Sequence, residues 1–162
     1  MTSGTIIESV KDAIAVASTI LEFAEKEVCW LVPAPLLVLA AHFNLNDKSR
    51  VLMQKGGHER GITEISPLYV ELVSELIDIG INVRHVEHYS GAFMVVGDGR
   101  QSISAIDVNV EDLSLDDKIV AFWTENPDYA AYLLSSFDRT WAEATDAQKR
   151  IQELSEDGPS HR

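Results

Sequence analysis

The residues that most constrain the fold are Val28 to Val32, five consecutive apolar side chains that end at Pro33. A strand with one face in water alternates apolar and polar residues, whereas a strand that is apolar throughout is covered on both faces. This run therefore predicts an interior strand of a β-sheet. A sheet with helices on both sides, as in α/β proteins, provides that environment.

Hydrophobic periodicity divides the rest of the chain into helices and strands. Apolar residues that recur every three or four positions predict helices over 5–26, 35–43, 67–79 and 127–154. Apolar runs rich in β-branched residues predict strands over 61–65, 82–87, 92–96, 102–108 and 118–123. The stretch 47–55 allows more than one assignment. The order of these elements predicts one α/β domain over 1–154, with a mixed β-sheet, helices on both faces, a long C-terminal helix and a flexible polar tail over 155–162.

Local signals support three of these elements. Thr5 and Glu8 have the spacing of a capping box at the start of the first helix. Pro67 suits the first turn of the helix over 67–79, and Gly80 suits a left-handed residue just after it. The pair Asp98-Gly99 predicts a hairpin turn between two strands.

The length of the predicted C-terminal helix indicates a partner for it. Residues 127–154 would extend about 42 Å as a single helix, and a small domain offers only about 25 to 30 Å of sheet to cover it. Another helix has to cover the rest, either the first helix of this chain or one from a second subunit. We therefore expect a homodimer with five candidate interface residues: Leu134, Phe137, Trp141, Ala144 and Ile151.

Charge and cysteine content exclude several classes of function. The chain has 13 Lys and Arg against 26 Asp and Glu, a formal net charge of −13. Such a surface repels phosphate and anionic lipid, so we expect no direct nucleic-acid binding and no membrane binding. The single Cys29, the lack of a secretion signal and a longest apolar run of only 14 residues, 28–41, predict a cytoplasmic protein.

Few residues could carry chemistry. His85 and His88 form the only close histidine pair, but positions three apart on a strand point to opposite faces, so we expect no metal site. Cys29 lies in an apolar strand, where burial raises the pKa of a thiol and makes it a poor nucleophile. Residues 97–99 share only their glycines with a phosphate-binding loop and precede a strand. We therefore expect no cofactor.

A family resemblance lies in the stretch from Gly80 to Ile106. It reads Gly-Ile-Asn-Val-Arg-His-Val, a spacer, Ala-Phe-Met-Val-Val-Gly-Asp-Gly-Arg and Ile-Ser-Ala-Ile. Together with the stretches 60–65, 120–124 and 137–141, it resembles the phospholipase D-like superfamily. More narrowly, it resembles the regulatory branch found in prokaryotic, especially archaeal, transcription regulators and sensor-kinase-associated proteins. The resemblance covers about residues 28–154 and implies half of a phospholipase D-like fold.

The catalytic motif of that superfamily is incomplete in this chain. Catalytic members carry His-x-Lys-x-x-x-x-Asp, and counting back from Asp98 places Gly91 at the His position and Phe93 at the Lys position. A phosphodiesterase that forms a phosphohistidine needs the imidazole, and the phosphate needs a cation beside it. The resemblance therefore implies a protein that is not an enzyme, in which Asp98 is a turn residue.

The function implied is that of a regulatory or sensory domain in signal transduction or transcription control. Such a domain would dimerise and bind a small-molecule effector or a partner regulator or kinase. Ligands of mixed α/β sheets tend to lie at strand ends, which suggests five candidate ligand-binding residues: Arg60, Glu64, Arg84, His85 and His88. The alternative for Arg60 and Arg84 is pairing with nearby carboxylates. The alternative function is a hydrolase with a rearranged polar site at His85, His88, Asp98 and Asp107.

Overall fold

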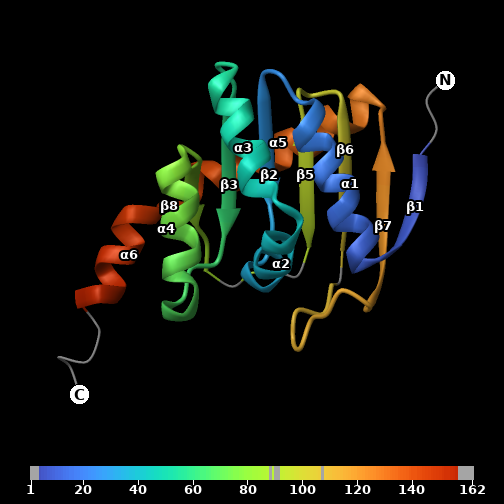
Figure 1. Ribbon diagram of the computed structural model, residues 1–162. Helices are drawn as coiled ribbons and strands as arrows, with labels where there is room; N and C mark the ends of the chain where they lie inside the picture. The colour runs from blue at the N-terminus through green and yellow to red at the C-terminus, as the bar shows by residue number, and fades with distance from the viewer. Residues whose placement is uncertain (1–3, 88, 90–91, 107, 157–162) are drawn as a thin grey trace.

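The computed structural model describes residues 4–87, 89, 92–106 and 108–156, which form strands and helices as Figure 1 shows. The strands are β1 (Gly4–Ser9), β2 (Glu27–Leu31), β3 (His58–Thr63), β4 (Asn82–His85), β5 (Phe93–Gly97), β6 (Gln101–Ala105), β7 (Lys118–Thr124) and β8 (Thr145–Asp146). The helices are α1 (Val10–Phe23), α2 (Ala34–Ala40), α3 (Leu45–Gln54), α4 (Val70–Ile79), α5 (Pro127–Glu143) and α6 (Ala147–Glu156), with short 3-10 turns η1 (Ala41–Phe43) and η2 (Pro67–Tyr69).

All eight strands form one mixed sheet in the order β1-β7-β6-β5-β2-β3-β4-β8. β2, β3 and β4 run parallel to one another, and every other neighbouring pair is antiparallel. The helices cover both faces, with α1 to α4 on one side and α5 on the other (Figure 1). The predicted fold class, an α/β domain with a mixed sheet, is confirmed.

The apolar run that predicted an interior strand is β2, which lies between β5 and β3. Its side chains alternate between two hydrophobic cores. Val28 and Trp30 pack in the larger core under α1 to α4, which we call the first face, whereas Cys29 and Leu31 pack in the smaller core under α5, the second face. Because both faces are covered by helices, the four positions from Val28 to Leu31 favour apolar side chains.

The first predicted helix, 5–26, is wrong at its beginning. Residues 4–9 form the edge strand β1, antiparallel to β7, and the helix begins only at Val10. Its cap is Ser9, whose Oγ accepts a hydrogen bond from the backbone N–H of Asp12 at 3.1 Å. The capping-box spacing of Thr5 and Glu8 was misleading because the β-branched Thr5, Ile6 and Ile7 also suit a strand.

The predicted single helix over 127–154 is wrong in its middle. The C-terminal region is helical, but Ala144 leaves the helix with extended backbone angles (φ −76°, ψ 152°). The two residues of β8 then pair antiparallel with Arg84 and His85 of β4. The Asp146 side chain accepts from the backbone N–H of Lys149 at 3.2 Å, within the first turn of α6. The apolar spacing continues across this break, so periodicity alone did not reveal it.

The other assignments need smaller changes. The ambiguous stretch 47–55 belongs to α3, and the helix predicted over 67–79 is the turn η2 followed by α4. Gly80 ends α4 with φ of 113°, a left-handed conformation that confirms its predicted role. No helix among the described residues has both the length and the apolar character needed to cross a membrane.

Asp98 joins the predicted hairpin turn to the start of β2. Asp98 and Gly99 both have positive φ, 54° and 64°, as the turn prediction requires. The Asp98 carboxylate accepts hydrogen bonds of 2.8 to 2.9 Å from the backbone N–H groups of Glu25, Lys26 and Glu27. Partial burial alone would raise the pKa of this carboxyl, but the three backbone donors and the nearby Lys26 charge lower it overall.

We expect Asp98→Asn to keep the turn, because Asn tolerates positive φ, but to weaken the bonds to residues 25–27. The free energy of unfolding should fall by about 1 to 2 kcal/mol at neutral pH. The folded-state pKa of Asp98 lies below its ordinary value of 3.8, so its contribution is complete above that pH and is lost as pH falls through the folded-state pKa.

Urea denaturation at several pH values measures this difference. The difference in the free energy of unfolding between the native chain and Asp98→Asn should become smaller as the pH falls below 4. The control is Asp78→Asn at an exposed position of α4, which should change the free energy of unfolding little. A gap that stays constant down to pH 2 would show that the charge of Asp98 does not stabilise the turn.

Candidate functional site

Four of the five predicted ligand-binding residues lie within the described part of the chain, and these four do not meet in one place. Arg60 and Arg84 extend over the second face toward α5, while His85 is tied to the loop after β3 at the carboxyl ends of the parallel strands. Glu64 is exposed after β3. His88 lies outside the described residues. The structure therefore divides the predicted cluster into an arginine group and a histidine group.

Arg60 lies between carboxylates and aromatic rings. Its Nη2 donates to Glu27 Oε1 at 3.0 Å and to Asp138 Oδ1 at 3.3 Å. Its guanidinium carbon lies 5.0 Å from the centre of the Phe137 ring and 5.3 Å from that of Trp141. Pairing with carboxylates, the alternative considered for Arg60, is what the structure shows.

Arg84 holds the end of α5. Its Nη1 donates to the backbone carbonyl of Trp141 at 2.7 Å, and its guanidinium carbon lies 4.2 Å from the centre of the Trp141 ring. A cation at a helix C-terminus also interacts favourably with the helix dipole. Its partner is thus a carbonyl and an aromatic ring instead of the expected carboxylate, and both arginines serve to fix α5 on the sheet.

Cys29 lies beside Arg60 but is poorly suited to be a nucleophile. Burial raises the pKa of its thiol to about 12, with Glu27 adding to the rise and Arg60 opposing it. The thiol therefore stays protonated at neutral pH, as its apolar strand predicted.

Both ring nitrogens of His85 are engaged by the protein. Nδ1 accepts a hydrogen bond from the backbone N–H of Ile65 at 2.8 Å, and Nε2 lies 3.0 Å from Glu87 Oε1. Because Nδ1 is the acceptor, Nε2 carries the hydrogen and donates it to Glu87. The side chain is only 3% exposed. The ring therefore has no free nitrogen to offer a substrate.

Arg150 of α6 extends this group. Its Nε donates to the carbonyl of Ile65 at 3.1 Å, and its Nη1 lies 3.8 Å from Glu87 Oε1. The backbone of Ile65 thus joins three elements: the loop after β3, the end of β4 and α6. Sequence reasoning missed Arg150 because it placed this residue far along a single straight helix.

A cavity of about 490 Å³ opens beside His85 at the carboxyl ends of the strands. Leu31 and Val86 line it together with polar residues from β4, the segment after β4, the second half of α5 and β8. These polar residues are His85, Glu87, Tyr89, Arg139, Thr140, Glu143 and Thr145. Both cations and carboxylates line it, so it suits a polar molecule with donors and acceptors. No sequence motif includes Arg139, Thr140 or Glu143. Only the fold places them near the carboxyl ends of the strands.

Of the four residues of the alternative hydrolase site, the structure describes His85 and Asp98, and it does not bring these two together. The Asp98 side chain accepts hydrogen bonds from the backbone at the amino end of β2, whereas His85 lies at the carboxyl end of β4. Because β2 and β4 run in the same direction, the two residues lie at opposite ends of the strands. Gly91, His88 and Asp107 lie outside the described residues. No group of three or more metal-ligating side chains occurs among the described residues.

Four of the five predicted interface residues pack in the hydrophobic cores of their own chain. Leu134, Phe137 and Trp141 pack in the core between α5 and the sheet, and Ile151 packs with the first-face core. Ala144 ends α5. The premise of one helix of about 42 Å is wrong, so its length gives no reason for a second subunit.

We expect His85→Ala to destabilise the fold, because it leaves the buried N–H of Ile65 without an acceptor. The free energy of unfolding should fall by about 2 kcal/mol. His85→Asn should recover part of the loss, since its Oδ1 can accept near the position of Nδ1. Thermal and urea denaturation test this, with the exposed His58→Ala as a matched control; equal stability of His85→Ala and His58→Ala would contradict it.

Comparisons with known proteins locate this fold among solved structures. No protein-family model and no curated protein matches the sequence. The archaeal chromatin protein TrmBL2, described as showing a novel mode of DNA binding, matches 88% of this chain with a TM-score of 0.69 and 17% identity. This chain spans only 54% of TrmBL2.

Two bacterial structures match over nearly their whole length. Nuc from Salmonella typhimurium, a phospholipase D family member, covers 90% of this chain with 98% of its own, at a TM-score of 0.70 and 11% identity. NucT from Helicobacter pylori covers 90% of this chain with 99% of its own, at a TM-score of 0.68 and 8% identity. The mixed sheet with helices on both faces is therefore the phospholipase D-like fold.

Proposed function

We propose that the chain is a non-catalytic domain of the phospholipase D-like fold that acts in signal transduction or transcription control by binding a small ligand or a partner protein. The observation that carries the proposal is Phe93, which stands where the resemblance places the phosphate-holding Lys. Its side chain is 4% exposed and packs in the first-face core. An apolar group in that position supplies no charge to a phosphate.

The geometry of His85 supports the same proposal. This histidine is the one in the alternative hydrolase site whose contacts the structure describes, and both of its nitrogens bond to the protein. A general base or nucleophile needs a nitrogen directed at the substrate. Its bonds to Ile65 and Glu87 instead fix the loop after β3.

TrmBL2 supports a regulatory role over a catalytic one. It is a chromatin protein that shares the fold of this chain over about half of its own length. A chain with this fold can thus form part of a chromatin protein. The partner that we propose for the present chain is a separate regulator, kinase or small-molecule effector.

Dimerisation is part of the proposal, with a surface other than the five residues first considered. Tyr132 of α5 is 67% exposed and stacks on Tyr129, which contacts Phe122 of β7 edge to face. Ile6 of β1 pairs with Phe122 and is 54% exposed. A second copy of the chain would cover these apolar groups on the second face.

We expect no cleavage of phosphodiesters. Purified chain should leave a labelled DNA duplex, an RNA strand and a chromogenic phosphodiester intact, with and without divalent metals, because neither Gly91 nor Phe93 can replace the missing His and Lys. Turnover that co-purifies with the chain and disappears in His85→Asn would replace this proposal with the hydrolase alternative.

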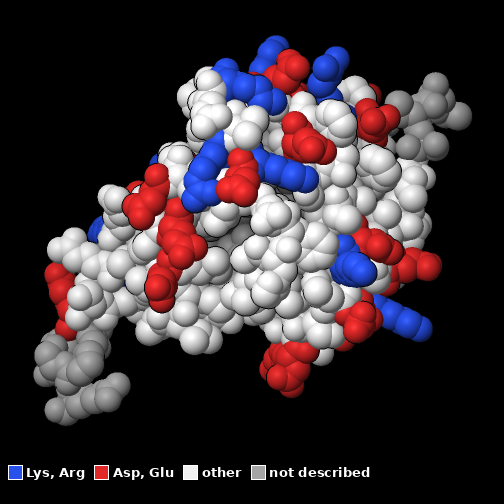
Figure 2. All heavy atoms as spheres, in the orientation of Figure 1, with Lys and Arg blue, Asp and Glu red and all other residues white. Residues whose placement is uncertain are grey.

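The same labelled duplex tests direct nucleic-acid binding. Fluorescence anisotropy at about 150 mM salt should show no binding at micromolar protein, because 26 acidic residues oppose 13 basic ones. Acidic and basic groups are also interspersed over the face shown in Figure 2. Micromolar or tighter affinity would show that the chain has its own nucleic-acid site.

Light scattering coupled to size exclusion tests the dimer. The native chain should give about twice its mass of 17.9 kDa, and Tyr132→Glu should shift the mass toward that of one chain. Leu68→Glu, at an apolar residue that is 79% exposed before α4, is the matched control and should leave the dimer intact. A native chain that is monomeric across the micromolar range removes dimerisation from the proposal.

A further inference from the structure

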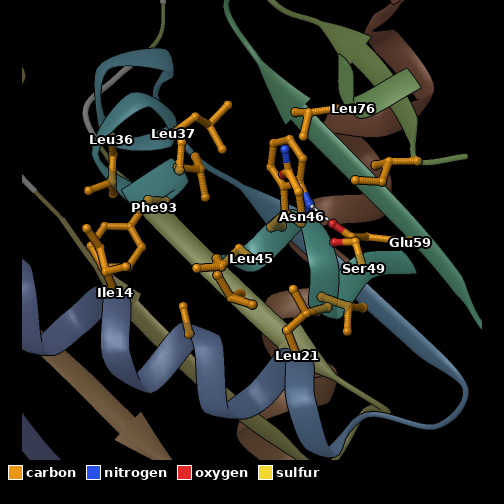
Figure 3. A pocket seen from close by; sticks show the side chains of 18 of the residues that line it. Ile14, Leu21, Leu36, Leu37, Leu45, Asn46, Ser49, Glu59, Leu76 and Phe93 are labelled. Atoms are coloured by element: carbon orange, nitrogen blue, oxygen red, sulfur yellow. Dashed lines mark hydrogen bonds between the residues drawn. The ribbon is translucent and has the colours of Figure 1, made fainter. Parts of the chain in front are cut away.

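A second cavity lies within the first face, between the helices α1 to α4 and the sheet. Its volume is about 80 Å³, and most of the side chains around it are apolar. Figure 3 shows aliphatic and aromatic groups at one end of it, among them Ile14, Leu36 and Phe93. The polar residues Asn46, Ser49 and Glu59 lie toward the other end. The same face is hollowed near its centre, between α2 and α4 (Figure 2).

Glu59 is the buried carboxyl group at the polar end. It comes from β3 and is 5% exposed. Its Oε2 accepts a hydrogen bond from Trp30 Nε1 at 2.8 Å, whereas the buried Oε1 has no hydrogen-bond partner among the described residues. Buried carboxyl oxygens are normally paired, so one that borders a cavity indicates a missing polar partner.

The surrounding residues hold Glu59 in this position. Trp30 lies against Gly61 of the neighbouring strand, where an added Cβ would come within 2.1 Å of the indole ring. Only a glycine leaves room for the ring, and the ring in turn fixes Oε2. Burial raises the pKa of the Glu59 carboxyl, and the polar groups of Ser49 and Trp30 lower it by less. The carboxyl therefore favours its protonated form more than an exposed glutamate does.

We propose that this cavity binds a small aliphatic alcohol, with its hydroxyl on Glu59 Oε1 and its carbon chain against the apolar end. This inference deepens the proposed function by naming a ligand class, and it rests on that function only for the idea that binding serves regulation. An anionic ligand does not fit, because neither Lys nor Arg is among the lining residues and Glu59 would face the anion.

The volume limits the size of the ligand. A cavity needs roughly 10 to 15 Å³ to hold a water molecule, and one of about 150 Å³ holds benzene. The volume of this cavity, about 80 Å³, is larger than a water molecule needs and smaller than that of the cavity that holds benzene. Because 80 Å³ is about half of 150 Å³, the ligand should have about half of the heavy atoms of benzene, which is a chain of about two carbons with one hydroxyl.

Nuclear magnetic resonance of the full chain tests the proposal with three probes. These are ethanol, its isomer dimethyl ether, which lacks the hydroxyl hydrogen, and the anion acetate. The indole N–H of Trp30 is the reporter, because it bonds to the same carboxyl group. We expect a saturable shift of this signal with ethanol, at least fivefold weaker affinity for dimethyl ether, and no saturable shift with acetate.

Two leucine substitutions on α1 locate the binding. Ala17 lines the cavity, so Ala17→Leu should fill it and weaken ethanol binding at least tenfold. Ala15 is exposed on the same helix, so Ala15→Leu is the matched control and should bind within twofold of the native chain. If Ala17→Leu does not fold, Ala41→Leu at the exposed rim of the cavity replaces it.

Three results would overturn the inference. They are the absence of a saturable shift in the native chain, equal affinity for ethanol and dimethyl ether, and unchanged ethanol binding when the cavity is filled. Failure here is separate from failure of the proposed function. Phosphodiester cleavage would refute the non-catalytic role and leave a positive ethanol result standing, whereas absent binding without cleavage refutes the alcohol site alone.

Discussion

The structure depends on covering both faces of β2 at once. The strand is apolar at nearly every position and lies between β5 and β3, so neither face can be left to water. The helices α1 to α4 follow the early strands and cover the first face. The second face depends on α5, which begins after β7, two strands beyond β5 in the sheet. That helix must cross beneath the sheet, and Arg60 and Arg84 hold it there through Asp138 and the Trp141 carbonyl.

Local signals in the sequence were enough for much of the fold. The strand 28–32, the turn at Asp98 and the helix that ends at Gly80 each depend on neighbouring residues, and the structure contains all three. The first strand was missed because residues 4–9 satisfy a helical spacing as well as a strand. The break in the predicted helix at Ala144 was missed because it depends on the pairing of β8 with β4, about 60 residues earlier in the chain. No residue near Ala144 in the sequence indicates that contact.

The candidate sites were harder to predict than the fold. Arg60 and His85 were selected for their polarity near strand ends, and the structure shows that their polar atoms bond to the protein itself. Glu59 was overlooked because the predicted strand began only at residue 61, whereas β3 begins at His58 and includes Glu59. Its burial depends on Trp30 across the strand pair and on the helices above, contacts that the sequence does not display.

The two outer strands of the sheet differ in what they offer to another protein chain. β8 is only two residues long and is continuous with α6, and short edge strands of this kind limit pairing with further strands. At the opposite border, β1 presents six residues and pairs with β7 on one side only. Sheet extension by an added strand is therefore directional in this molecule: it is open beside β1 and restricted beside β8.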